Sequence, residues 1–181
     1  MTTYIAFLRA INVSGLKLIK MEELRSALAG IPGVKNVRTY IQSGNVIFDA
    51  KEGEEEKLRV KIEKQIKKVF DYEVETFVRT SDELAAILKN SPFHKAKLSK
   101  DLALYVTFLE EKPTAEARKA FEALSDDIDS YKIEGKEVYA LVVKNGKKSL
   151  FSNMFVEKKL KQKATGRNQT TLHKILELIG K

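Results

Sequence analysis

The 181-residue sequence contains no cysteine and no tryptophan, and it has only three prolines and two histidines. Without cysteine the chain can form no disulfide bond and can use no thiolate chemistry, which favours a reducing compartment and predicts a cytoplasmic protein. Its apolar runs are too short to cross a bilayer, and the first residues, MTTYIAFLRAINV, include no basic leader. We therefore expect neither a membrane anchor nor a targeting segment.

The usual signatures of a reaction are also missing. His94 and His173 have no histidine or acidic partner at ligand spacing, so we expect no metal and no cofactor. Ser43, within QSGN, lacks the leading glycine of a nucleophile elbow. Neither G-x-G-x-x-G nor G-x-x-x-x-G-K-[ST] occurs, which removes the two commonest nucleotide-binding motifs. Whether the protein is an enzyme stays open at this point.

The positive charge is concentrated at one end of the chain. The net charge is +8, and the stretch from Lys144 to Lys174 alone carries nine Lys/Arg residues against one acid, Glu157. The rest of the chain is balanced, with 24 basic and 24 acidic residues. This asymmetry suggests an anionic partner, although a solvated lysine-rich face that keeps the protein soluble explains it equally well.

Apolar periodicity predicts the order strand, helix, two strands, helix, strand and helix for the first half of the chain. Residues 55–70, for example, place Leu58, Ile62 and Ile66 on one helical stripe. Ser81 is predicted to cap the third helix. The order is that of a ferredoxin-like α+β unit, with helices on one face of an antiparallel sheet.

After a polar connector the same order begins again. We therefore predict two ferredoxin-like units, residues 1–95 and 96–181, that arose by internal duplication. The hairpin around Glu134 and Gly135 matches the one around Ser43 and Gly44, and a tyrosine precedes the glycine by four residues in both. The alternative is that two unrelated α+β halves share common hairpin chemistry.

The first hairpin, VRTYIQSGNVIF, has more polar residues than a turn requires. A two-residue loop at Ser43 and Gly44 would place Ile41 opposite Val46. Four polar side chains would then share the other face of the sheet with Ile47; they are Arg38, Tyr40, Gln42 and Asn45. A three-residue loop would instead mix the two faces. The polar face would meet either a planar or anionic ligand or the second half of the chain.

Three segments carry a resemblance to a known family. FLRAINVSGLKLIKMEELRSAL with VRTYIQSGNVIF, and ATGRNQTTLHKI near the C-terminus, are similar to the bacterial family called domain of unknown function 1697. The resemblance runs from Tyr4 nearly to the C-terminus. The chain departs from the usual family motifs at Ala10, Ser14, Gly166, Gln169 and Thr170. The resemblance implies a fold of two small α+β units and implies no reaction.

The candidate site residues come from three segments. The first half carries an extra loop, Ile11–Lys20, between its first strand and helix, and such insertions often hold sites. Asn168 is expected to cap the last helix, where Arg167 and free backbone donors would favour an anion. The predicted anion-binding residues are Arg9, Asn12, Lys20, Arg38, Tyr40, Gln42, Asn45, Arg167 and Asn168.

Three functions are compatible with these features. The first is a binding module for an anionic partner, namely a nucleotide, RNA or a phosphorylated small molecule. The second is an enzyme that acts on a small anionic substrate in a cleft between the halves. The third is an interaction or scaffold protein that forms a homodimer. No feature indicates a membrane partner.

Overall fold

A computed structural model describes residues 1–144 and 148–180, which form eight strands and six helices. The same βαββαβα order occurs twice, as the sequence predicts. In chain order the elements are β1 (Thr2–Leu8), α1 (Met21–Ala29), β2 (Lys35–Tyr40), β3 (Asn45–Ala50), α2 (Glu55–Phe70), β4 (Thr76–Thr80), α3 (Ser81–Lys89), β5 (Leu102–Leu109), α4 (Ala115–Glu122), β6 (Asp129–Glu134), β7 (Glu137–Val143), α5 (Asn153–Leu160), β8 (Ala164–Asn168) and α6 (Gln169–Ile179).

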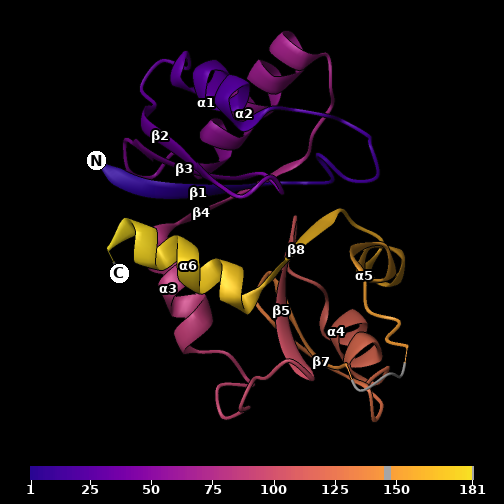
Figure 1. Ribbon diagram of the computed structural model, residues 1–181. Coiled ribbons are helices and arrows are strands. Elements are labelled where there is room, and N and C mark those ends of the chain that lie inside the picture. The colour runs from indigo at the N-terminus through magenta and orange to yellow at the C-terminus, as the bar shows by residue number, and fades with distance from the viewer. Residues whose placement is uncertain (145–147, 181) are drawn as a thin grey trace. The chain divides into compact units, whose positions relative to one another are not determined.

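The first four strands form an antiparallel sheet in the order β2-β3-β1-β4. Helices α1 and α2 lie together on one face of this sheet (Figure 1). Leu28 of α1 and Ile62 of α2 join Tyr4 and Phe48 of the strands in one buried cluster. The stripe of apolar residues on α2 thus faces the sheet because its members recur every three or four positions.

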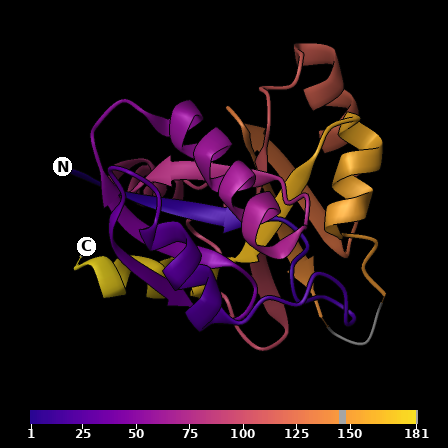
Figure 2. The ribbon, with the colours of Figure 1, turned by 90° about the horizontal axis from the view of Figure 1, so that it is seen from above.

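The last four strands form a second antiparallel sheet, in the order β6-β7-β5-β8. Helices α4 and α5 cover one face of it, and they lie on the same side of its strands when the view is turned by 90° (Figure 2). Phe121 of α4 and Val156 of α5 are buried with Tyr131 and Val138 of the strands. Aromatic contacts dominate this core, with the Phe121 and Tyr131 ring centroids 5.2 Å apart.

The two sheets are topologically equivalent. Adding four to the number of each strand in the order β2-β3-β1-β4 gives β6-β7-β5-β8, and each helix corresponds to the one three later. Both orders are those of the ferredoxin-like fold. The predicted fold class, two similar α+β units with antiparallel sheets, is confirmed.

The two hairpin tyrosines, however, are not equivalent. Tyr131 pairs with Ala140 and its ring belongs to the core beneath α4 and α5. Tyr40 pairs with Asn45, which pairs in turn with Phe7, and these residues point away from α1 and α2. The shared spacing from tyrosine to glycine is therefore coincidental, although the hairpins themselves correspond.

The loop of the first hairpin is longer than predicted. Tyr40 pairs with Asn45, so four residues, Ile41 to Gly44, form the loop. Ile41 does not face Val46; it has φ 51° and is half exposed. The Asn45 side chain donates to the Tyr40 carbonyl oxygen and to Ser43 Oγ, both at 3.0 Å, which stabilises this wider turn. Because the pairing moves by two residues, Arg38, Tyr40, Asn45 and Ile47 still share one face, whereas Gln42 lies in the loop.

The cap of α3 lies one residue earlier than predicted. Thr80 Oγ1 accepts the backbone N–H of Glu83 at 3.1 Å, and the Glu83 carboxylate accepts the Thr80 N–H at 2.7 Å. These reciprocal bonds form a capping box, which needs a hydroxyl three residues before an acid. Ser81, the residue after Thr80, is the first residue of the helix.

The face of the first sheet opposite α1 and α2 is buried as well. Ile5, Phe7 and Ile47 are each at most 1% exposed. At the edge of this face Arg38 Nη1 donates to the carbonyl oxygen of Leu178 in α6 at 2.9 Å. The polar residues of the hairpin therefore border a covered face. Of the four strand residues on this face, Arg38 is exposed, whereas Tyr40, Asn45 and Ile47 are half-buried or buried.

The chain divides into two compact units: residues 1–84 together with the chain from Ile175 onward, and residues 85–174. The chain passes from one unit to the other within α3 and again within α6, whereas the sequence predicts a boundary near residue 95. That residues 1–95 and 96–181 are separate domains stays a prediction. Within the described residues no helix has the length and apolar character needed to cross a membrane.

Candidate functional site

Most of the predicted anion-binding residues of the first unit have side-chain partners within the protein. Arg9 Nη1 lies 3.2 Å from Glu75 Oε2, and the two residues also share a backbone hydrogen bond of 2.9 Å. Lys20 is exposed and lies 3.7 Å from Glu23, a surface pair that contributes little to stability. A cavity of about 530 Å³ beside Lys20 is also lined by Glu22 and Glu23, so its charge does not favour an anion.

Asn12 is the structural centre of the inserted loop. Its Nδ2 donates to the carbonyl oxygens of Ile19 and Gln42, at 3.0 and 2.9 Å, and its Oδ1 accepts from the Ile19 N–H at 2.8 Å. The loop therefore has defined contacts at both ends and to the hairpin, although Leu16 and Leu18 are exposed. Anion binding by Arg9, Asn12, Lys20 and the hairpin residues stays a prediction.

The predicted site at the start of α6 has a different geometry from the expected one. Arg167 lies within β8 opposite Val106, and its side chain is buried on the face of the sheet that α4 and α5 do not cover. Its Nη1 donates to Thr165 Oγ1 at 2.8 Å and to the Gly166 carbonyl oxygen at 2.9 Å. Burial lowers the pKa of Arg167 to about 10. Asn168 Oδ1 accepts the Thr170 N–H at 2.8 Å, as expected of a cap.

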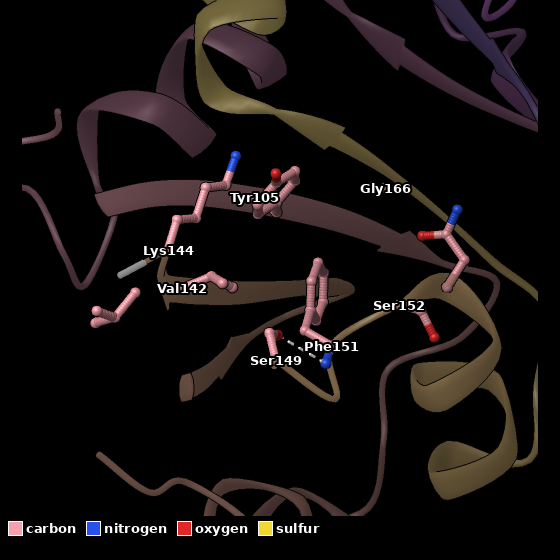
Figure 3. A pocket seen from close by; sticks show the side chains of 9 residues that line it. Tyr105, Val142, Lys144, Ser149, Phe151, Ser152 and Gly166 are labelled. Carbon is pink, nitrogen blue, oxygen red and sulfur yellow. Dashed lines mark hydrogen bonds between the residues drawn. The ribbon is translucent and has the colours of Figure 1, made fainter. Parts of the chain in front are cut away.

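A cavity that the sequence analysis did not identify lies in the second unit (Figure 3). Its volume is about 520 Å³, in the range of small-molecule sites. The residues that line it come from both central strands, from β8 and from the segment before α5; they are Tyr105, Val142, Val143, Lys144, Ser149, Phe151, Ser152, Asn153 and Gly166. No carboxylate is among the described residues that line it.

Two aromatic rings and one ammonium group shape the cavity. The Tyr105 and Phe151 rings are tilted against each other with centroids 5.3 Å apart. Lys144 Nζ lies 5.5 Å from the centroid of the Tyr105 ring, within range of a cation–π contact. In Figure 3, Lys144 stands at one end of the cavity and Ser152 and Gly166 at the other, with both rings between them.

A buried carboxylate holds the segment that carries Phe151. Asp129 lies opposite Val142 in the sheet and is 2% exposed. Its oxygens accept from Ser149 Oγ at 2.7 Å, from the Leu150 N–H at 3.0 Å and from the Tyr131 hydroxyl at 3.0 Å. Ser149 Oγ then accepts the N–H of Phe151 at 3.0 Å, drawn as the dashed line in Figure 3. One carboxylate therefore positions this segment of the wall through two neutral donors, and it also accepts the Tyr131 hydroxyl.

The end of the cavity at Gly166 is closely packed with polar atoms. Gly166 pairs with Thr107, and a Cβ atom on residue 166 would lie 2.7 Å from Asn153 Oδ1 and 2.8 Å from Thr107 Oγ1. Thr107 is completely buried, and its hydroxyl has no hydrogen-bond partner among the described residues. The glycine therefore gives room to these two oxygen atoms, and a larger side chain at residue 166 would clash with both.

Sequence reasoning missed this cavity because its residues are unremarkable one by one. Tyr105 fits the ordinary alternation of side chains along a strand. Gly166 stands out in the sequence only as a departure from a family motif. The only signal was the basic stretch that begins at Lys144 and contains most of the wall. The sequence places its candidate anion site at the start of α6, because a helix start can be recognised in a sequence whereas a cavity formed by three strands and a loop cannot.

The fold and the cavity define a class: a duplicated, ferredoxin-like α+β protein with a small-molecule-sized cavity in its second unit. The chain belongs to the family described as protein of unknown function DUF1697, whose model matches residues 1–139. That match includes Tyr105 but ends before Val142 and the remaining residues of the cavity wall. No curated protein gives a significant match.

A solved structure shares the whole fold. The conserved bacterial protein SP0830 from Streptococcus pneumoniae is 21% identical to this chain, and the alignment covers 97% of each chain with a TM-score of 0.71. At this level of identity the similarity establishes the fold and nothing about a ligand or a reaction.

Proposed function

We propose that the protein is a binding module for a small phosphorylated organic molecule, held in the cavity of the second unit. The observation that carries this proposal is the cavity wall itself, in which the Tyr105 and Phe151 rings adjoin Lys144 and no described residue of the wall carries a carboxylate. The apolar part of the ligand would contact the rings, and its anionic group would pair with Lys144.

The charge distribution supports an anionic ligand. The cavity lies at the beginning of the stretch that holds the entire net charge of +8. Such a field raises the local concentration of anions and accelerates their association, and it weakens as salt is added. The carboxylate that holds the wall segment, Asp129, already accepts three hydrogen bonds from the protein.

A small molecule accounts for the geometry better than RNA does. Sheets that recognise RNA present aromatic residues on adjacent strands, so that successive bases can stack. Among the described residues of the cavity wall, Tyr105 is the aromatic residue that lies on a strand. The second ring, Phe151, comes from the segment before α5 and not from an adjacent strand. The two rings border a single cavity, which suits one planar group.

The test is calorimetric titration at low and moderate salt with adenosine 5′-monophosphate, phenyl phosphate, adenosine and inorganic phosphate. We expect the two molecules that combine a ring with a phosphate to bind, and the other two to bind much more weakly. Lys144→Gln should weaken binding about two- to fivefold, the range for one exposed charge pair. Lys158→Gln removes the same charge from the exposed end of α5 and should have little effect.

Two results would contradict this proposal. One is the absence of saturable binding by either phosphate at low salt. The other is an equal loss of affinity in Lys144→Gln and Lys158→Gln, since that result would indicate a diffuse attraction by the basic stretch rather than a site.

A further inference from the structure

The hydroxyl group of Tyr105 differs from those of the buried tyrosines. Tyr4, Tyr131 and Tyr139 are each at most 2% exposed, and each donates its hydroxyl to an acceptor within the protein at 3.0 Å. Tyr105 is half-buried and lines the cavity, and its hydroxyl forms no hydrogen bond with any residue that the structure describes. This hydroxyl can therefore donate to a ligand in the cavity without losing a bond within the protein.

The ring of Tyr105 is positioned by its neighbours. Tyr105 lies in the middle of β5, on the face of the sheet that also carries Ala140. Its ring packs against Phe151, and Lys144 Nζ lies 5.5 Å from its centroid. A tyrosine has only two side-chain torsions, so a packed ring also fixes the direction of its hydroxyl. The ammonium of a lysine, by contrast, is a point charge on a flexible stem.

The hydroxyl and the ammonium serve the same end of the cavity. In Figure 3 the oxygen of Tyr105 and the nitrogen of Lys144 lie on the same side of the tyrosine ring. Both groups can donate hydrogen bonds, and a phosphate monoester presents three oxygen atoms that accept them. One phosphate group can therefore accept from the ammonium and from the hydroxyl at the same time.

We infer that Tyr105 is a specificity-determining residue of the cavity, whose hydroxyl donates a hydrogen bond to the phosphate group that pairs with Lys144. The inference rests on the proposed function and adds a second contact to the phosphate. In this arrangement Lys144 attracts the anion and Tyr105 orients it.

This contact adds to the preference for phosphorylated ligands. A hydrogen bond to an ionised group is stronger than one between neutral groups. A ligand without the phosphate offers the hydroxyl no charged acceptor at this end of the cavity. The loss of the hydroxyl should therefore weaken phosphate binding although the net charge of the protein does not change.

The test is calorimetric titration of Tyr105→Phe with phenyl phosphate and adenosine 5′-monophosphate at low salt. This variant lacks the hydroxyl and keeps the ring, so the contacts of the ring with Phe151 and Lys144 remain. We expect both ligands to bind about three- to tenfold more weakly, the effect of one hydrogen bond. Tyr139→Phe is the matched control, because it removes a hydroxyl from the opposite face of the same sheet. It should leave both affinities unchanged.

Thermal unfolding without ligand provides a readout independent of binding. Because the Tyr105 hydroxyl has no partner among the described residues, Tyr105→Phe should not lower Tm. A fall of several degrees would overturn the inference, since it would mean that the hydroxyl already stabilises the protein through an internal bond.

The binding outcomes separate the two proposals. If both phosphates bind the natural protein and Tyr105→Phe equally well, the role of the hydroxyl is wrong and the proposed function stands. An equal loss of affinity in Tyr105→Phe and Tyr139→Phe would also overturn the inference, because the loss would not be specific to the cavity. If neither phosphate binds the natural protein, the proposed function fails and the inference fails with it.

Discussion

The side chain of Asn12 is hydrogen-bonded to the carbonyl oxygen of Gln42 at 2.9 Å, which joins the inserted loop of the first unit to the tip of its hairpin. The same amide group is bonded twice to Ile19, so three hydrogen bonds converge on one residue. Asn12 also has φ 53°, in the left-handed region that asparagine tolerates better than most residues.

Asn12→Ala should therefore destabilise the protein by about 2–4 kcal/mol, through lost hydrogen bonds and an unfavourable φ. The measurement is urea unfolding at constant pH. Asn12→Gly separates the two causes, because it removes the bonds and relieves the backbone. We expect it to be about 1 kcal/mol more stable than Asn12→Ala. Equal stabilities of the two variants would refute the role of backbone strain.

A second prediction compares two glycines with similar backbones. Gly44 has φ 79° and Gly53 has φ 74°, so alanine is disfavoured at both. A Cβ on residue 44 would also stand 2.8 Å from Leu8 Cβ and from Ile11 Cδ1, whereas one on residue 53 would meet nothing within 4 Å. We expect Gly53→Ala to cost about 1 kcal/mol and Gly44→Ala about 3 kcal/mol or more.

The measurement is again the free energy of unfolding from urea denaturation. Similar losses in Gly44→Ala and Gly53→Ala would show that the packing of the hairpin loop against Leu8 and Ile11 is not tight, and would contradict the prediction.

The order of elements could be predicted from the sequence because each element has its own apolar period. Leu58, Ile62 and Ile66 determine the buried face of α2 without reference to any other segment, and they are buried in the structure. The faces of the first hairpin were also predicted correctly, because alternation along a strand survives a shift of two residues in the pairing. Such local patterns determine which side of an element is buried.

Features that depend on several segments could not be predicted. The length of the first hairpin loop follows from the bonds of the Asn45 side chain to Tyr40 and Ser43, and Ser-Gly alone does not specify it. Arg167 is predicted to bind an anion because it precedes a helix, and that role stays a prediction. Its alternating place in β8, which turns its side chain into the protein, could not be predicted from its neighbours. The cavity needs the registers of β5 with β7 and of β5 with β8, which neighbouring residues do not reveal.

The third prediction concerns the capping box of α3. Thr80→Ala should destabilise the protein by about 1 kcal/mol, because the N–H of Glu83 loses its acceptor. Glu83→Gln should have a smaller effect, since a glutamine oxygen can still accept the N–H of Thr80. Urea unfolding of both variants provides the measurement. A larger loss in Glu83→Gln than in Thr80→Ala would mean that charge, rather than the reciprocal bonds, stabilises this helix start.

The last prediction is a dependence of stability on alkaline pH. Burial raises the pKa of Tyr131, and its hydrogen bond to Asp129 at 3.0 Å raises it further, because the bond requires the protonated phenol. Burial also raises the pKa of Tyr139, whose hydroxyl donates to the carbonyl oxygen of Ile87 at 3.0 Å. In the unfolded chain both phenols ionise near pH 10, at about the ordinary pKa of tyrosine.

Because both folded-state pKa values are raised, the unfolded state loses these protons first. The corresponding stability is fully present below about pH 10 and is lost as the pH rises above it, by up to about 1.4 kcal/mol per pH unit for each tyrosine. Tyr131→Phe cannot ionise, so it should be less stable than the natural protein at pH 8 by about 1 kcal/mol, the worth of its hydrogen bond. The difference should shrink or reverse by pH 11.

Urea unfolding at intervals from pH 8 to pH 11 measures this effect, and the difference between the two proteins cancels the titration of the lysines. Tyr139→Phe should behave similarly, and the two effects should add in the double variant, because the hydroxyls have separate partners. A constant stability difference between Tyr131→Phe and the natural protein across this range would contradict the buried, protonated state of Tyr131. It would also weaken the case for Asp129 as the anchor of the cavity wall, since the same carboxylate holds Ser149 and Leu150.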